Sequence, residues 1–273
     1  MKIIIIGGTG LIGSKVVTKL LHAGFEAVAA SRRSGVDTMS GRGLGDVLAG
    51  ASVVIDVSSP PTFDGAQALE FFEASTTNLL AAEAASSVQH HVALSVVGTD
   101  RLSESGYMRA KLAQEKLIKA GSIPYSIVRA TQFFESIQKL AGLTADRASV
   151  HVPPVLVQPI AGDDVARMLS TVAVGTPLNA TIEQAGPEEF RADELARRRL
   201  KARHDSRQVV VDPRARFFGA EVEERTLLPG ADAHVAETRF EDWLAGSIER
   251  AYAALRPPAP TSETGYYGAA PTS

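Results

Sequence analysis

The sequence of 273 residues contains no cysteine, a single tryptophan and few aromatic residues. Without cysteine the chain can form neither a disulfide nor a thiolate metal site, and its absence fits a reducing compartment. An excess of charge is also lacking, because 28 Lys and Arg residues face 31 Asp and Glu residues. This balance argues against nucleic acid or an anionic membrane as a partner.

Long hydrophobic runs are missing as well. The chain opens on four isoleucines, Ile3 to Ile6, but glycine follows immediately. Such a run is too short for a signal peptide or a membrane span. We therefore expect a cytoplasmic protein that neither enters nor binds a membrane, with enough hydrophobic residues (45%) for a large core.

The segment KIIIIGGTGLIGS (2–14) is the strongest local pattern. Its isoleucines are β-branched and form a run of strand length. Beyond the glycines, apolar residues recur at helical spacing: Leu11, Ile12, Val16, Leu20 and Leu21. The segment therefore predicts a strand, a tight glycine turn and a helix.

Three glycines in this turn, Gly7, Gly10 and Gly13, are typical of a dinucleotide site. They let the backbone bend, approach a pyrophosphate closely and pack the helix against the strand. The free N–H groups and dipole of the helix N-terminus favour a phosphate at this point. We predict that pyrophosphate binds at Gly7, Thr9, Gly10, Leu11, Ile12 and Gly13.

The second predicted strand, residues 26–31, ends at Ser31, Arg32 and Arg33. An NAD-binding fold carries an acidic residue about 20 residues past the glycine turn, where it binds the adenosine ribose. Here two arginines stand instead, and a guanidinium suits a 2′-phosphate by charge and by its planar donors. We therefore predict NADP(H) as cofactor; the alternative is that both arginines are simply solvated.

Strand and helix patterns continue to alternate after this point. Strands are predicted at 52–57, 91–97 and 125–130, and helices at 44–48, 64–86 and 107–120. Such alternation implies right-handed crossovers and an α/β fold with a doubly wound parallel sheet. Because Ser58 begins a proline-containing loop after the third strand, we expect it to lie over the cofactor.

The pattern becomes irregular in the second half of the chain. We predict a dinucleotide-binding domain at 1–135, the remaining sheet edge with a small C-terminal cap at 136–255, and a flexible tail at 256–273. The tail is rich in Pro, Ala, Gly, Ser and Thr.

Tyr107, Lys111 and Ser95 are the candidate catalytic residues. Tyr107 and Lys111 are one helical turn apart and share a helix face. Ser95 lies near the carboxyl end of a strand, where ligands bind in such sheets. A phenol can donate the proton that a reduced carbonyl needs, and a nearby lysine cation should lower its pKa. The alternative is that Tyr107 is a half-buried packing residue.

At these residues the chain resembles the atypical, NmrA-like branch of the short-chain dehydrogenases/reductases. The matching stretches are GGTGLIG, SVVG, the Tyr-x-x-x-Lys of YMRAKLAQEKL, and VRATQFF, all within residues 1–135. The later segment PIAGDDVAR is also similar. The resemblance implies that Lys111 holds the nicotinamide ribose and that Ser95 bonds the substrate oxygen.

The resulting prediction is an NADP(H)-dependent oxidoreductase that reduces a small carbonyl, enone or quinone-like molecule. Phe133, after the fifth strand, is expected to line the substrate pocket. Two alternatives remain: a non-catalytic NADP-binding redox sensor, and a nucleotide-sugar epimerase or dehydratase. The pair His90-His91 lies at a strand start, away from the cofactor edge, so no metal is expected.

Overall fold

The structure of the protein, a computed structural model, describes residues 1–136 and 148–255. The tail predicted for 256–273 lies outside the described residues. A parallel sheet of seven strands forms its centre, in the order β11-β8-β5-β4-β3-β1-β2. The strands are β1 (Lys2–Ile6), β2 (Glu26–Ala30), β3 (Val53–Asp56), β4 (His90–Val96), β5 (Tyr125–Ala130), β8 (Ala180–Ala185) and β11 (His234–Val235).

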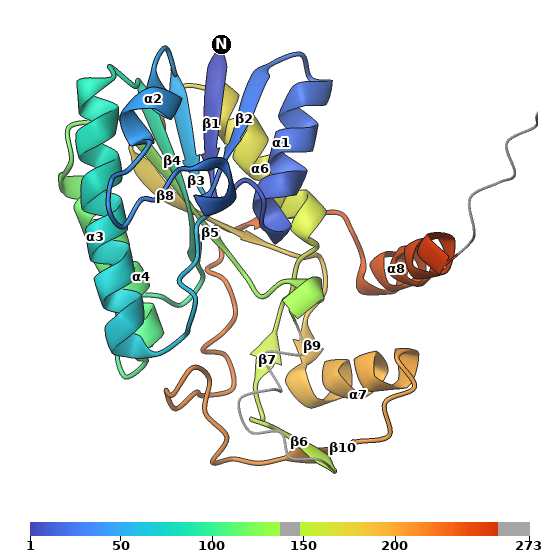
Figure 1. Cartoon of the computed structure of the whole chain (residues 1–273). Helices are drawn as coiled ribbons and strands as arrows, with labels where there is room; N and C mark the ends of the chain where they lie inside the picture. Colours follow the sequence, from blue (N-terminus) through green and yellow to red (C-terminus); the bar gives the residue numbers. More distant parts are fainter. Residues whose placement is uncertain (137–147, 256–273) are drawn as a thin grey trace, which may run out of the picture.

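Helices cover both faces of this sheet (Figure 1). On one face lie α1 (Leu11–His22) and α6 (Gly162–Val174); on the other lie α2 (Leu44–Leu48), α3 (Gly65–Ala85) and α4 (Gly106–Ala120). The predicted doubly wound parallel α/β fold is thus confirmed. No helix in the described ranges combines the length and the apolar character needed to cross a membrane.

The four isoleucines of β1 show why the sheet needs two helical layers. All are buried, and alternate side chains of a strand point to opposite faces. Ile3 and Ile5 belong to a core cluster with residues of α1 and α6. Ile4 and Ile6 belong to another cluster with residues of α2 and α3. A strand buried on both faces is continuously apolar, as this one is.

The strand order reverses between β1 and β3. From β1 the chain goes to β2 on one side, and β3 then pairs with β1 on the other. In open α/β sheets, ligands bind outside the carboxyl ends of the strands at this switch point. The loops after β1 and β3 meet there.

Most of the second half of the chain lies beyond the carboxyl ends of the strands (Figure 1). It includes η2 (Phe134–Ser136), β6 (Ser149–Val152), β7 (Leu156–Val157), β9 (Phe190–Arg191), α7 (Ala192–Ala202), β10 (Gln208–Val211) and α8 (Phe240–Leu255). Strand β6 pairs in parallel with β10, and β7 pairs antiparallel with β9.

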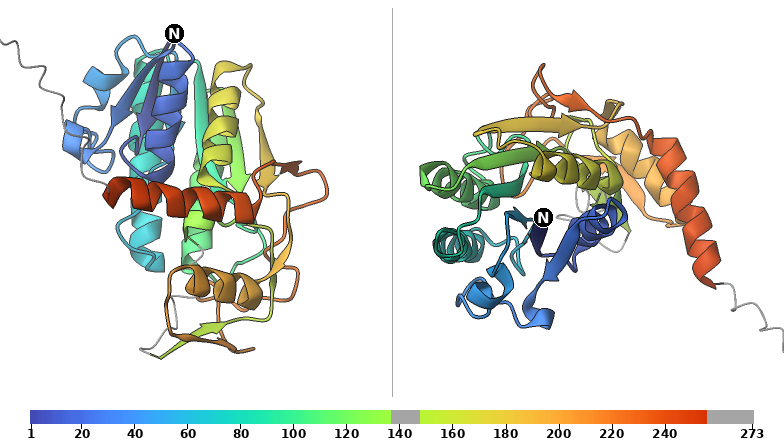
Figure 2. Two further views of the ribbon diagram at one scale, coloured as in Figure 1. Left: turned by 90° about the vertical axis from the view of Figure 1, so that its right-hand side faces the viewer. Right: turned by 90° about the horizontal axis from the view of Figure 1, so that it is seen from above.

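Aromatic side chains at the start of α8 fix this helix to the rest of the cap. Phe240 packs against Phe134 and Phe190, with ring centroids 5.3 and 5.7 Å apart, and Trp243 also contacts Phe134. Beyond these contacts α8 extends past the side of the sheet (Figure 2). The aromatic contacts hold the cap against the segment that follows β5.

Candidate active site

The glycine turn joins β1 to α1 through close backbone contacts. Gly7 has a positive φ of 78°, and its N–H donates to Ala30 O at 3.0 Å. A Cβ at Gly13 would lie 2.3 Å from Gly7 O, and one at Gly7 would lie 2.9 Å from Val57 O. Side chains are therefore excluded where the turn meets both α1 and the loop after β3.

A cavity of about 620 Å³ opens at this turn, at the carboxyl edge of the sheet. Among the residues that line it are most of the predicted site residues: Gly7, Thr9, Gly10, Leu11, Ile12, Ser31, Arg32, Ser58, Ser95, Tyr107, Lys111 and Phe133. Gly13 and Arg33 are not among the lining residues; Gly13 instead packs α1 onto the turn. One cavity thus joins the glycine turn to the candidate catalytic residues.

At the end of β2 the cavity is lined by a carboxylate as well as by Arg32. The chain turns through η1 (Arg32–Ser34), and Asp37 then returns to the cavity wall. Arg32 Nε lies 3.7 Å from Asp37 Oδ1, and the Arg32 side chain is 64% exposed. Asp37 was not predicted as a site residue, because only this turn brings it back beside Arg32.

Lys111 is buried, and its ammonium donates to two groups inside the protein. Its Nζ donates to Leu94 O at 2.8 Å and to Gln114 Oε1 at 2.5 Å. Burial lowers the pKa of Lys111 to about 8, although the negative charges of Asp56 and Glu115 act in the opposite direction.

Gln114 connects this lysine to the loop after β3. Its Nε2 donates to Asp56 Oδ2 at 2.9 Å, and the other oxygen of Asp56 accepts from the Ser58 N–H, also at 2.9 Å. Lys111, Gln114 and Asp56 are each at most 3% exposed. The network thus couples Lys111 to the position predicted to lie over the cofactor.

Tyr107 lies in the first turn of α4 among other aromatic rings. Its ring is stacked on Phe218 at 5.1 Å between centroids and meets the edge of Phe63 at 5.1 Å. Burial raises the pKa of Tyr107 to about 12. From the sequence we expected Lys111 to lower the pKa of Tyr107, but in this conformation the lysine ammonium donates to Leu94 and Gln114 instead.

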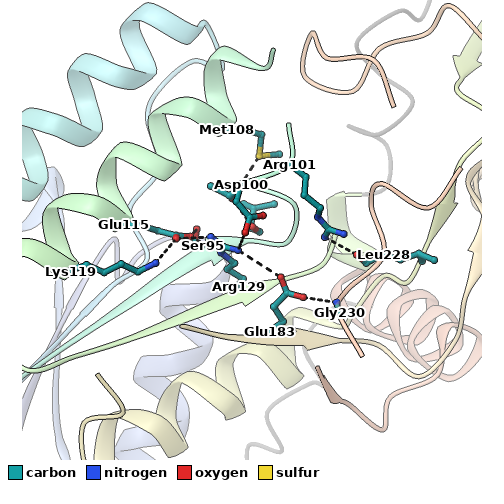
Figure 3. A network of polar contacts seen from close by, with 12 residues as sticks. Ser95, Asp100, Arg101, Met108, Glu115, Lys119, Arg129, Glu183, Leu228 and Gly230 are labelled. Carbon is teal, nitrogen blue, oxygen red and sulfur yellow. Dashed lines mark hydrogen bonds and ion pairs between the residues drawn. The ribbon is translucent and has the colours of Figure 1, made fainter. Parts of the chain in front are cut away.

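Ser95 contacts a buried ion-pair network (Figure 3). Its Oγ donates to Glu115 Oε1 at 2.7 Å, and Arg129 binds both oxygens of Glu115 at 2.9 and 2.8 Å. Because the hydroxyl hydrogen is directed at Glu115, Ser95 can accept but not donate a hydrogen bond toward the cavity in this arrangement.

Arg129 extends the same network toward the cap. It donates to Asp100 at 2.7 Å and lies 3.9 Å from Glu183, which accepts from the Gly230 N–H at 2.7 Å. Burial disfavours the ionised form of Glu115, but the hydrogen bonds and positive charge of Arg129 favour it more strongly. They hold the pKa of Glu115 below its ordinary value.

Besides Asp37, two further cavity residues were not predicted from the sequence: Gln132 and Phe218. Within the described residues neither amide atom of the Gln132 side chain has a hydrogen-bond partner, although both are buried. Phe218 has a positive φ of 47°, which is unusual for a bulky residue and stores strain. The one signal for Phe218 in the sequence is the glycine that follows it.

The histidine pair lies inside the protein. His91 Nδ1 is 2.8 Å from Glu83 Oε1, and both side chains are fully buried. His90 Nε2 is 2.8 Å from Ser126 Oγ, and burial lowers the pKa of His90 to about 4. Over residues 1–136 and 148–247 no group of three or more His, Asp or Glu side chains is arranged to hold a metal ion.

The fold belongs to the Rossmann class of doubly wound α/β sheets, and solved structures support this assignment. UDP-glucose 4-epimerase from Thermotoga maritima superimposes with a TM-score of 0.73, at 14% identity over 94% of this chain and 100% of that chain. A short-chain dehydrogenase/reductase superfamily protein from Agrobacterium tumefaciens, solved with NAD, gives 0.69 at 16% identity, over 93% and 98%.

A dTDP-4-dehydrorhamnose reductase from Bacillus anthracis, solved with NADP, gives a TM-score of 0.63 at 15% identity, over 93% and 99% of the two chains. No protein-family model matches the chain. Photosystem II assembly factor Ycf39 from Cyanophora paradoxa is 24% identical over 151 residues, 50% of this chain and 47% of that protein. The match thus spans about half the length of this curated relative. The resemblance drawn from the sequence is confirmed at the level of the fold.

Proposed function

We propose that the protein is an NADP(H)-dependent oxidoreductase of the short-chain dehydrogenase/reductase type, acting on a small carbonyl, enone or quinone-like substrate. One observation carries the proposal: a single cavity is lined both by the glycine turn and by Tyr107 and Lys111. The solved structures of similar fold that contain NAD or NADP add support.

The residues of the cavity fit a dinucleotide. Thr9, Gly10, Leu11 and Ile12 line it at the N-terminus of α1, whose free N–H groups and dipole favour a pyrophosphate. Gly7 and Gly13 support this contact by keeping the turn tight. Ser58 Oγ is buried and without a hydrogen-bond partner in the described structure, so it is free to bind a polar group of the cofactor.

The choice of NADP(H) rests on Arg32, with Ser31 and Arg33 beside it. The Arg32 guanidinium is exposed at the cavity rim and can form paired hydrogen bonds with a phosphate. Asp37 offsets part of this charge and orients the guanidinium. Arg33 lies outside the cavity wall, so we assign it the smaller contribution.

Nicotinamide would supply or accept the hydride when the cofactor is bound. Tyr107 acts as the proton donor to the substrate oxygen, and burial keeps its phenol protonated before reaction. Lys111 holds the nicotinamide ribose and supplies positive charge to the site, and Ser95 contacts the substrate oxygen. For Ser95 to donate to that oxygen, its hydroxyl has to turn away from Glu115.

The test is cofactor binding followed by the fluorescence of the reduced nicotinamide. We expect NADPH to bind more tightly than NADH, and Arg32→Ala to weaken NADPH binding about ten- to a hundredfold, because a charged hydrogen bond is lost. Binding of NADH should hardly change. Arg167→Ala, at an exposed position of α6, is the matched control. Equal losses for both cofactors would refute the phosphate assignment.

The nucleotide-sugar alternative has one supporting observation, the similarity in fold to UDP-glucose 4-epimerase. Such an enzyme keeps its NAD during turnover, so purified protein would carry bound NAD that NADPH does not displace. The redox-sensor alternative predicts that Tyr107→Phe leaves function intact. We favour the reductase because Arg32 lines the cavity and because Tyr107 and Lys111 are both present.

A further inference from the structure

We propose that Gln132 binds the substrate, and that this substrate is an uncharged, flat ring with a carbonyl oxygen next to an N–H group. The inference rests on the proposed function and specifies its substrate class. It starts from the Gln132 side chain, whose Nε2 and Oε1 are both buried and without a hydrogen-bond partner in the described part of the chain.

Buried amides are almost always hydrogen-bonded in native proteins, so two unpartnered amide atoms on a cavity residue form a pair that a bound ligand can satisfy. Gln132 lines the cavity, two residues beyond the carboxyl end of β5. Its amide presents a donor and an acceptor side by side. The complementary ligand group is therefore an acceptor beside a donor, as in a carboxamide, a lactam or an aminoquinone.

The backbone around Gln132 is held in place. Gln132 O accepts from the Ile160 N–H at 2.9 Å, and the Phe134 N–H donates to Ile160 O at 2.9 Å. On the preceding residue, Thr131 Oγ1 donates to Gln158 O at 2.6 Å. The amide is thus attached to a fixed segment, which lowers the conformational cost of binding a ligand.

Aromatic side chains define the shape of the ligand. Phe63, Tyr107 and Phe218 all line the cavity, and their ring centroids are 5.1 to 5.2 Å apart. Such rings present flat faces on which another ring can stack.

The backbone of Phe218 is strained in a way that fixes its ring. Phe217 and Ala220 exchange backbone hydrogen bonds around a two-residue turn, and both Phe218 and Gly219 have positive φ. This turn type favours Asn or Gly at the first central position. The fold thus retains a phenylalanine at a costly position, and strain of this kind is concentrated at ligand sites.

The charges around the cavity favour an uncharged ligand. Among its described lining residues the charged ones are Arg32, Asp37 and Lys111. Arg32 and Asp37 lie at the end of β2, and the Lys111 ammonium already donates to Leu94 and Gln114. Beside the aromatic rings the described lining of the cavity therefore offers one cation, already engaged in two hydrogen bonds, and no arginine that could pair with a phosphate or carboxylate.

Two ring compounds of nearly equal shape provide the test: menadione, and its analogue with an amino group in place of the ring methyl. Both are flat and uncharged, but only the analogue has an N–H next to a carbonyl. Their affinities for the NADP⁺ complex can be measured by calorimetry, because the oxidised cofactor prevents reduction of either ring. We expect the analogue to bind about tenfold more tightly or better, since it forms both hydrogen bonds.

Gln132→Met should abolish this preference and leave NADP⁺ affinity unchanged, and Gln89→Met, at an exposed position, is the matched control. The thermal midpoint of ligand-free Gln132→Met should equal or exceed that of the wild type, because no hydrogen bond is lost. A folded variant that retains the preference would overturn the proposal, as would failure of both rings to bind the wild-type complex. A loss of NADP⁺ affinity in Gln132→Met would assign the amide to the cofactor instead. If the wild type binds no NADP⁺, the proposed function itself fails.

Discussion

Replacing Glu115 by glutamine tests the network that surrounds Ser95. The Glu115 and Arg129 side chains are 1% and 9% exposed, and Arg129 Nη2 lies 2.8 Å from Glu115 Oε2. Removing one partner of a buried ion pair costs about 3 to 5 kcal/mol, because the other charge remains buried. Arg129 keeps Asp100 at 2.7 Å, and a glutamine oxygen can still accept one bond. We therefore expect a loss near the lower limit, about 3 kcal/mol in the free energy of unfolding.

Urea unfolding followed by circular dichroism measures this loss, with Lys119→Gln as control. Lys119 Nζ lies 3.3 Å from Glu115 Oε2, but its side chain is 39% exposed. Its removal should cost less than about 0.5 kcal/mol, as is usual for exposed pairs. If Glu115→Gln lowers the free energy of unfolding by less than about 1 kcal/mol at neutral pH, the Glu115 carboxylate is not needed to neutralise the buried Arg129.

A second test is the pH dependence of the difference in unfolding free energy between wild type and Glu115→Gln. Because the pKa of Glu115 is lowered in the folded state, its contribution is fully present above its unfolded pKa of about 4.3. The contribution is lost as the pH falls through the folded pKa. The gap between wild type and Glu115→Gln should therefore be constant from pH 7 to about 5 and narrow in more acidic solution. A gap that widens on acidification would contradict this reasoning.

Two further predictions concern the glycine turn and Lys111. Gly13→Ala should destabilise the fold by about 2 kcal/mol or more and abolish cofactor binding, because its Cβ would lie 2.3 Å from Gly7 O. Gly45→Ala should be stabilising by up to about 1 kcal/mol, because no atom outside its own helical backbone lies within 4 Å of the added Cβ. Unfolding and binding measurements on both variants check this, and equal effects would contradict it. Burial lowers the pKa of Lys111 to about 8, so between pH 8 and 10 the unfolded chain binds more protons than the folded protein. The free energy of unfolding of the wild type should therefore rise over this pH range, by up to about 3 kcal/mol relative to Lys111→Met. A constant difference between the two proteins across this pH range would show that Lys111 is not desolvated.

Local patterns were sufficient to predict the first five strands and their helices. The β-branched run 2–6 and the glycines after it determine β1 and the start of α1 by short-range rules. Strands β8 and β11 were not predicted individually. The sequence of β8, ATIEQA, is half polar, and β11 has two residues. Strand β8 is defined by its pairing with β5, which is distant in the sequence. Strand β11 is defined by its pairing with β8.

The residues of the candidate site also fall into two groups, those placed by local spacing and those placed by loops and tertiary packing. Gly7 to Gly13 and the pair Tyr107 and Lys111 could be predicted because their spacing within one element fixes their geometry. Asp37, Gln132 and Phe218 could not, because loops bring them to the cavity and no local periodicity marks them. The Glu115 contact to Ser95 depends on the packing of α4 against β4, which the sequence alone does not specify.

Ionisation of Tyr107, followed by ultraviolet difference spectroscopy with and without NADP⁺, tests the central claim most directly. The chain has five tyrosines, so Tyr107→Phe identifies the relevant signal. In the free protein we expect the signal missing from the variant to titrate near pH 12, because burial disfavours the phenolate. With NADP⁺ bound, the positive nicotinamide and Lys111 should bring this pKa well below about 10, the value of an unperturbed tyrosine. An unchanged pKa in the NADP⁺ complex would contradict the assignment of Tyr107 as the proton donor.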